Sequence, residues 1–195
     1  VKVYFEFFIS LILILLFLPF FFLVPIIIKL DSEGPIFFKQ TRVGYHGRKF
    51  KLLKFRTMVV GAEDQMDSLK GMNEQTGPAF KLVRDPRITG VGKFLRKYSL
   101  DEMPQFFNVL KGDMNLVGPR PPLPVEVDNY KTKWRRRLNM KPGITGLWQV
   151  SGRNDIVDFE DWVKLDLEYI DRWNLLLDIK IMLKTIPVIL RGSGK

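Results

Sequence analysis

Residues 7–28 form a run of 22 amino acids without a charged side chain, and this run limits the fold more than any other feature. As one straight helix it would measure about 33 Å, because an α-helix rises about 1.5 Å per residue. That length just crosses a bilayer whose hydrocarbon core is about 30 Å thick. The run therefore predicts a membrane-inserted segment over residues 1–30.

Pro19 lies inside this run and leaves two shapes open. Proline removes a backbone hydrogen bond and clashes with the preceding turn, so it kinks or breaks a helix. Broken there, the arms would be about 18 and 14 Å long, and each would reach roughly one leaflet. A re-entrant helix of this kind would return Lys2 and Lys29 to one headgroup layer, whereas a straight helix would span the bilayer. In both cases the positive-inside bias places residues 31–195 on the cytoplasmic face.

The chain is strongly basic, with 31 Lys and Arg against 21 Asp and Glu and a net charge of +10. A basic surface beside an apolar segment favours anionic lipid headgroups or phosphorylated substrates, with nucleic acid as the alternative. The absence of cysteine excludes disulfides and thiolate metal sites, and the one histidine lies in a turn. A nucleophile would therefore be a carboxylate, and a divalent metal would bind oxygen ligands.

The pattern after residue 30 predicts an α+β domain that is mostly helical, and not a doubly wound sheet. Short strands are expected at 36–38 and 50–55 around a turn at 44–47. Helices are expected at 62–69 and 91–97, from just after residues 99–102 to about residue 110, and at 159–173. Loops are expected at 76–87 and 118–122.

Two basic segments suggest contact with a membrane surface. Residues 173–190 are mostly apolar, but Lys180, Lys184 and Arg191 recur along one stripe. This pattern suits an interfacial helix with cationic ends at the headgroups, or alternatively a buried C-terminal helix with one solvated stripe. The basic residues of 131–137 surround Trp134, and they either meet lipid phosphates or form a solvated face.

Asp101 and Glu102 are the leading candidates for chemistry. Pro104 fits only the first turn of a helix, so both acids are expected at a helix N-terminus, where the dipole favours ionised carboxylates. Two adjacent carboxylates can reach Mg²⁺, and an ionised aspartate can attack phosphorus. The alternative is a capping box formed by Ser99 and Glu102.

Asp166 interrupts the apolar face of the predicted helix 159–173. A carboxylate buried there must be paired or functional, so we expect either a salt bridge to an arginine or a substrate contact. Arg96, Arg120 and Arg153 lie before the acid pair, between prolines and beside a glycine. Arginine's planar fork suits bidentate phosphate binding, and these three are the candidate phosphate ligands.

Taken in order, seven segments resemble the bacterial sugar transferases, the monotopic polyprenyl-phosphate phosphoglycosyl transferases. They are residues 37–44 (FFKQTRVG), 54–58 (KFRTM), 99–102 (SLDE), 108–114 (NVLKGDM), 118–121 (GPRP), 141–146 (KPGITG) and 149–154 (QVSGRN). Each is weak alone, but their joint order is specific and runs nearly end to end. Residues 76–89 resemble the larger members, in which further membrane helices precede this domain, and the start at Val1 agrees with that.

The resemblance implies a two-step reaction at the bacterial inner membrane that initiates exopolysaccharide, O-antigen or glycoconjugate assembly. Asp101 would attack the sugar-bearing phosphorus of a UDP-hexose, with glucose or galactose favoured, and release UMP. Polyprenyl (undecaprenyl) phosphate would then take the phosphosugar. Glu102 would support Mg²⁺ or the proton chemistry, and Arg96, Arg120, Arg153 and Asp166 match family phosphate-binding, structural or acidic positions.

Two departures from the family pattern are visible in the N-terminal segment. Leu18 precedes Pro19 where the family usually has serine, and Glu6 stands where it commonly has aspartate. Three alternatives remain open: a membrane-anchored scaffold, a nucleic-acid-binding protein, and a glycosyltransferase that releases UDP instead of UMP. We expect no nucleic-acid partner, since the acids and arginines lie in Gly/Pro loops, and a homodimer is left open.

Overall fold

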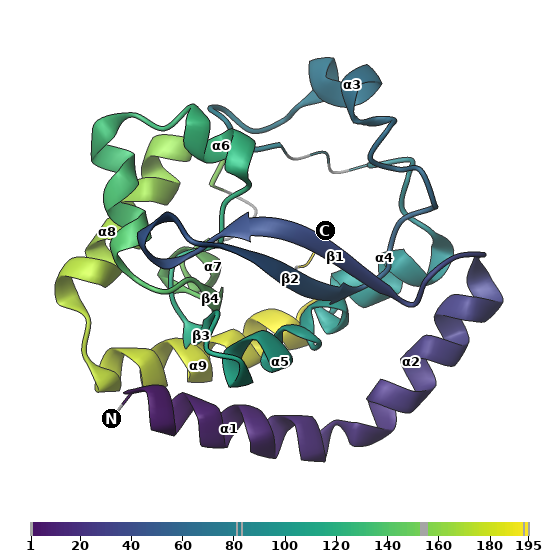
Figure 1. The fold of residues 1–195 in the computed structure, drawn as a ribbon, viewed down its shortest axis with the longest axis horizontal. Helices are drawn as coiled ribbons and strands as arrows, with labels where there is room; N and C mark the ends of the chain where they lie inside the picture. Colours follow the sequence, from purple (N-terminus) through teal and green to yellow (C-terminus); the bar gives the residue numbers. More distant parts are fainter. Residues whose placement is uncertain (1, 81, 83, 153–155, 193, 195) are drawn as a thin grey trace.

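The N-terminal apolar run folds into two helices that meet at a sharp bend. The chain bends by 60° between helix α1 (Lys2–Leu16) and helix α2 (Leu18–Asp31), and the two helices border two sides of the molecule (Figure 1). The bend lies at Phe17, two residues before the predicted break, because Pro19 is tolerated in the first turn of α2, where its missing N–H needs no partner. The arms are therefore longer than expected, about 22 and 21 Å.

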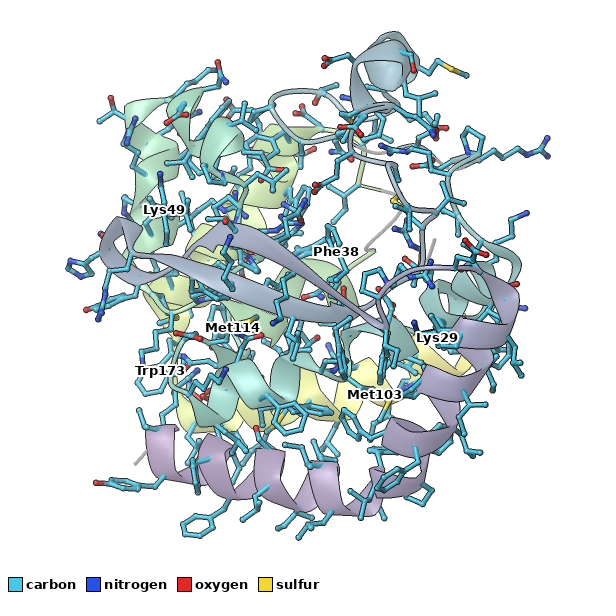
Figure 2. The ribbon with its side chains drawn as sticks, turned by 45° about the vertical axis from the view of Figure 1, so that its right-hand side comes forward. Lys29, Phe38, Lys49, Met103, Met114 and Trp173 are labelled. Carbon is cyan, nitrogen blue, oxygen red and sulfur yellow. The ribbon has the colours of Figure 1, made fainter. Side chains whose placement is uncertain are left out.

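Among the residues that the structure describes, no single helix has the length and composition to cross a membrane, and α1 and α2 meet that test only as a bent pair. Apolar side chains project outward along both helices (Figure 2). Ten of them are more than half exposed: Val3, Tyr4, Phe8, Ile12, Leu15, Leu16, Phe22, Leu23, Ile26 and Leu30.

The remainder is a mixed α/β unit in a computed structural model that describes residues 2–80, 82, 84–152, 156–192 and 194. Its elements are β1 (Phe37–Val43), β2 (Lys49–Phe55), α3 (Met66–Leu69), α4 (Gly90–Lys97), α5 (Gln105–Leu110), β3 (Asn115–Val117), α6 (Pro124–Asp128), β4 (Gly143–Thr145), α7 (Leu147–Val150), α8 (Phe159–Arg172) and α9 (Leu175–Leu190). The predicted mostly helical fold with short strands is confirmed.

Two small sheets organise this unit. Strands β1 and β2 form an antiparallel hairpin in which Phe37 pairs with Phe55 and Val43 with Lys49. The hairpin is longer than the expected strands, and the expected turn with His46 lies at its tip. Strands β3 and β4 form a parallel pair that the sequence did not predict, while the expected helix 62–69 shortens to α3 with a 3₁₀ turn after it.

The hydrophobic core is divided into three clusters. One lies among α6, α8 and residues 130–134 and is aromatic, with Tyr130, Trp134, Phe159 and Trp162. A second joins β2, β3, α5, α8 and α9, and the third packs α2 and α4 against Phe55 and Met103. The site described next lies where these clusters meet the hairpin and the helix bend.

The two basic segments differ from each other in the structure. Helix α9 exposes Leu176, Leu183 and Leu190 together with Lys180 and Lys184, the mixed face expected of an interfacial helix. In the other segment, Lys131 and Lys133 both contact Glu160, and Arg136 contacts Asp171. Arg137 is only 3% exposed, so this segment is neither wholly a solvated face nor a free cationic cluster.

Candidate active site

Two pockets adjoin each other beside the turn that carries Asp101 and Glu102. The larger, of about 160 Å³, is walled mainly by apolar side chains of the helix bend, α5, β4 and α9, including Phe17, Met103, Phe106, Ile144 and Ile189. The smaller, of about 120 Å³, contains the cations Arg42, Lys54 and Arg120. Glu102, Ile144 and Gln149 line both pockets. The two together can hold a ligand with one anionic and one apolar part.

The acid pair lies in a short 3₁₀ turn, Leu100–Glu102, directly before Pro104 and α5. Ser99 precedes it in the left-handed region, at φ 54°, and its side chain does not cap the turn. The capping-box alternative is therefore wrong. Asp101 is 6% exposed, and Glu102 is more open and reaches the pockets.

Lys54 connects the acid pair to the hairpin. Its Nζ lies 2.7 Å from Glu102 Oε1 and 3.6 Å from Asp101 Oδ2. Since directly paired residues of an antiparallel sheet share a face, Phe38, Gln40 and Arg42 lie on the same face as Lys54. One face of the hairpin thus brings Arg42 and Lys54 to the cationic pocket.

Arg42 and Arg120 form a pair of like charges in this pocket. Burial and the neighbouring charge of Arg120 lower the pKa of Arg42, but a guanidinium remains charged at neutral pH. Arg42 donates to Pro121 O at 3.0 Å and to Gln40 Oε1 at 2.7 Å, while its buried Nε has no partner within the described part of the chain. Arg120 is held by buried Glu126 at 3.1 Å and lies over the Trp162 ring. The carboxylates of Glu126 and Glu102 partly offset the charge of Arg42, and its buried Nε remains able to donate to an anionic ligand.

Arg96 lies near the acid pair at the end of α4, and not among the side chains lining the two pockets. Its Nε donates to Thr57 Oγ1 at 2.9 Å. Burial lowers the pKa of Arg96, and the nearby charge of Asp101 opposes that shift. Arg96 and Asp101 are therefore close enough for their opposite charges to attract each other.

Asp166 is a structural ion-pair partner in this geometry. It is 1% exposed and accepts from Arg137 at 2.8 Å and 2.6 Å. Burial raises the pKa of Asp166 to about 6, and Arg137 opposes that shift. The expectation of a salt bridge to an arginine is confirmed, and the contacts give no support to a substrate role. Arg153 lies outside the described residues.

Several site residues were not singled out from the sequence, among them Arg42, Lys54, Glu126, Trp148 and Gln149. Trp148 Nε1 and Gln149 Oε1, like Arg42 Nε, are buried polar atoms beside the cationic pocket, and no described residue partners them. Arg42 and Lys54 do occur in the segments that resemble the family, and the period of two along each strand was the signal that places them on one face.

Magnesium fits the acid pair in its donor chemistry. Mg²⁺ is usually held by one or two carboxylates together with substrate phosphates, and not by an all-protein cage. Within the described part of the chain, no three acidic or histidine side chains gather as a metal site, so Asp101 and Glu102 would be the protein ligands. Lys54 now contacts both carboxylates and would have to yield part of that contact.

The site thus combines a cationic pocket and an apolar pocket next to an exposed apolar helix pair. The chain belongs to the bacterial sugar transferase family, whose model matches residues 1–192.

Several known proteins are similar in sequence to this chain over most of its length. It is 56% identical over 173 residues to the galactosyl transferase CpsE of Streptococcus agalactiae, which covers 89% of this chain and 38% of that protein. It is 40% identical over 185 residues to the exopolysaccharide production protein ExoY of Rhizobium meliloti, and the match covers 93% of this chain and 81% of that protein. It is 49% identical over 166 residues to the undecaprenyl-phosphate galactose phosphotransferase of Salmonella typhimurium, and the match covers 83% of this chain and 34% of that protein. The chain thus spans little more than a third of the length of two of these relatives.

Proposed function

We propose that this protein transfers a sugar-1-phosphate from a UDP-hexose to polyprenyl phosphate. The observation that carries this proposal is the position of Glu102, which lines the cationic and the apolar pocket at once. The reaction needs such a junction, because a nucleotide diphosphate and a lipid chain must reach the same carboxylates. The names of relatives that act on undecaprenyl phosphate with galactose or glucose support both substrates.

In the first step, a carboxylate oxygen of Asp101 forms a bond to the sugar-bearing phosphorus of the donor. The bond from this phosphorus to the oxygen bridging to UMP breaks, and UMP leaves with that electron pair. Arg42 and Arg120 hold the charged phosphates, which supplies the positioning and charge stabilisation on which phosphoryl transfer depends. The product on the protein is an acyl phosphate that joins the carboxyl group of Asp101 to the phosphosugar.

In the second step, a phosphate oxygen of the polyprenyl phosphate attacks the same phosphorus. The bond to Asp101 breaks and the carboxylate is restored, so the lipid leaves as a polyprenyl diphosphate sugar. The apolar pocket holds the isoprenoid units next to the phosphate. Bound at Asp101 and Glu102, Mg²⁺ would neutralise charge on the phosphates.

The same reaction fits a location at the cytoplasmic face of the bacterial inner membrane. Phe17, at the bend between α1 and α2, lines the apolar pocket, so one wall of this pocket belongs to the exposed apolar helix pair. Each arm is too short to cross about 30 Å of hydrocarbon, which favours a re-entrant helix over a spanning one. Lys180, Lys184 and Arg191 would meet anionic headgroups.

The experiment is an assay of detergent-solubilised protein with Mg²⁺, polyprenyl phosphate and a panel of UDP-sugars. We expect UMP and a lipid diphosphate sugar with UDP-glucose or UDP-galactose, and loss of both products on chelation of the metal. Asp101→Asn should lower turnover at least about a thousandfold, whereas the exposed control Lys164→Met should not. Release of UDP, or wild-type turnover by Asp101→Asn, would contradict the proposal.

A further inference from the structure

Lys2, in the first turn of α1, is turned into the protein and away from the surface. Its side chain is only 13% exposed. Its ammonium donates to Asp178 Oδ2 at 2.8 Å, to the Tyr169 hydroxyl at 2.9 Å and to the Val117 carbonyl at 3.1 Å. All three N–H bonds of the ammonium therefore have acceptors within the protein.

Glu6, one turn further along α1, reaches the same strand residue. Its Oε1 accepts from Val117 N at 3.3 Å and lies 3.5 Å from Lys2 Nζ, and its side chain is 2% exposed. Lys2 and Glu6 thus bind the carbonyl and the amide of one residue. Asp178, which also accepts from Tyr169 at 2.6 Å and from Trp173 at 2.9 Å, completes the buried cluster.

Val117 is fully buried and lies three residues before Arg120. The connection between them is rigid. Gly118 N donates to Thr145 O and Gly143 N to Pro119 O, both at 2.9 Å. A Cβ on Gly143 would lie 2.0 Å from Gly118 N, so the backbones touch without spare room. A shift of Val117 must therefore move the loop that carries Arg120.

We propose that Lys2 and Glu6 are positioning residues that hold Arg120 for the donor through the backbone of Val117. The inference rests on the proposed function in one respect, the binding of the donor phosphates by Arg120. On this proposal, the position of the membrane-facing helix α1 against Val117 affects the binding of the nucleotide. A displacement of α1 would weaken donor binding, although α1 does not line the pockets.

The burial of this charge favours positioning over simple attachment. An ion pair buried at a helix interface costs desolvation free energy, and apolar side chains would fix α1 to α5 and α9 at lower cost. Charged groups are retained here where they contact a backbone carbonyl and amide. Hydrogen bonds to the backbone of Val117 fix the position of the loop that carries Arg120 more closely than apolar packing would.

Steady-state kinetics of Lys2→Met and Glu6→Leu in the full chain test the inference. We expect KM for the UDP-sugar to rise about tenfold, the effect of one or two lost charged hydrogen bonds, with kcat within about threefold of wild type. KM for polyprenyl phosphate should not change, and the exposed control Lys164→Met should match wild type. Lys2→Arg, which keeps the charge, should recover part of the loss.

The combination with Arg120→Met separates positioning from loss of stability. If Lys2 acts through Arg120, the double variant should be no weaker for the donor than Arg120→Met alone, whereas independent effects multiply. If Lys2→Met fails to fold, Tyr169→Phe removes one acceptor of the ammonium and should raise donor KM about threefold.

Multiplicative losses, or equal changes in both substrates, would overturn the inference. A wild-type donor KM in these variants would do the same. Failure of the proposed function is distinguishable, because the wild-type protein would then release no UMP at all.

Discussion

At the scale of single residues, the cationic pocket is defined by how its two arginines are compensated. Buried Glu126 pairs with Arg120 and also accepts from Leu123 N at 2.8 Å. Arg42 instead donates to a carbonyl and an amide oxygen, and its buried Nε has no partner among the described residues. A dianionic or trianionic diphosphate would supply the missing acceptors and the missing charge.

Replacing either arginine by lysine keeps the charge and removes the planar fork. For Arg42→Lys and Arg120→Lys we expect KM for the UDP-sugar to rise about tenfold, because a bidentate charged contact is lost. Donor titrations at saturating lipid measure this effect. Arg136→Lys, in an exposed pair with Asp171, is the matched control and should be neutral. An unchanged donor KM in both pocket variants would contradict the binding of the donor phosphates in this pocket.

The pair of Arg137 and Asp166 gives a contrasting prediction at the same scale. Removal of one partner leaves an uncompensated buried charge, so Arg137→Met or Asp166→Leu should lower the free energy of unfolding by about 3–5 kcal/mol. The double variant should recover most of this loss. Denaturant unfolding in detergent measures it. A large donor KM effect at unchanged stability would instead restore the substrate role considered for Asp166.

Sequence reasoning reached the residue Asp166 but not its partner. An acid on an apolar helix face must be paired, and that inference needed no structure. Arg137 lies 29 residues earlier, among neighbouring cations that face solvent, and a run of basic residues does not tell which one points inward. Tertiary packing decides this, and the same applies to Lys2, whose acceptors come from β3, α8 and α9.

At the scale of elements, the sequence predicted that the apolar helix is broken, but it did not predict that the bend lies at Phe17. Pro19 predicted a kink or a break in the helix, but the first turn of α2 accommodates this residue, so the break falls just before it. The pair β3 and β4 was not predictable, because strands of three residues have no usable period. Their pairing depends on the close approach of Gly118 and Gly143, which are 25 residues apart.

The bend yields a prediction on topology. Pro19→Ala restores a backbone donor at the bend, so a part of the molecules should adopt a straight, spanning helix. Because the chain has no cysteine, a single cysteine placed before Lys2 can be labelled with an impermeant maleimide in spheroplasts. We expect little labelling when Pro19 is present and increased labelling in the Pro19→Ala variant, while Ser32→Cys stays protected in both. Strong labelling of the proline-containing protein from outside would contradict the re-entrant helix.

At the scale of the whole molecule, the fold brings a hairpin, a carboxylate turn and a bent apolar helix pair to one place. The hairpin supplies cations, the turn supplies the carboxylates, and the bend supplies an apolar wall. The carboxylates and Arg120 were identified from the order of motifs in the sequence. The division into two pockets required the structure, because the walls come from segments as distant as Phe17 and Ile189.

The central claim is that Asp101 carries the phosphosugar between two half-reactions. The most direct measurement is incubation of the protein with a sugar-labelled UDP-hexose and Mg²⁺ in the absence of polyprenyl phosphate, followed by mass spectrometry of its peptides. We predict release of about one equivalent of UMP and one phosphosugar on Asp101, discharged by added lipid and absent from Asp101→Asn. UMP release that requires the lipid, or a label on another residue, would contradict the account.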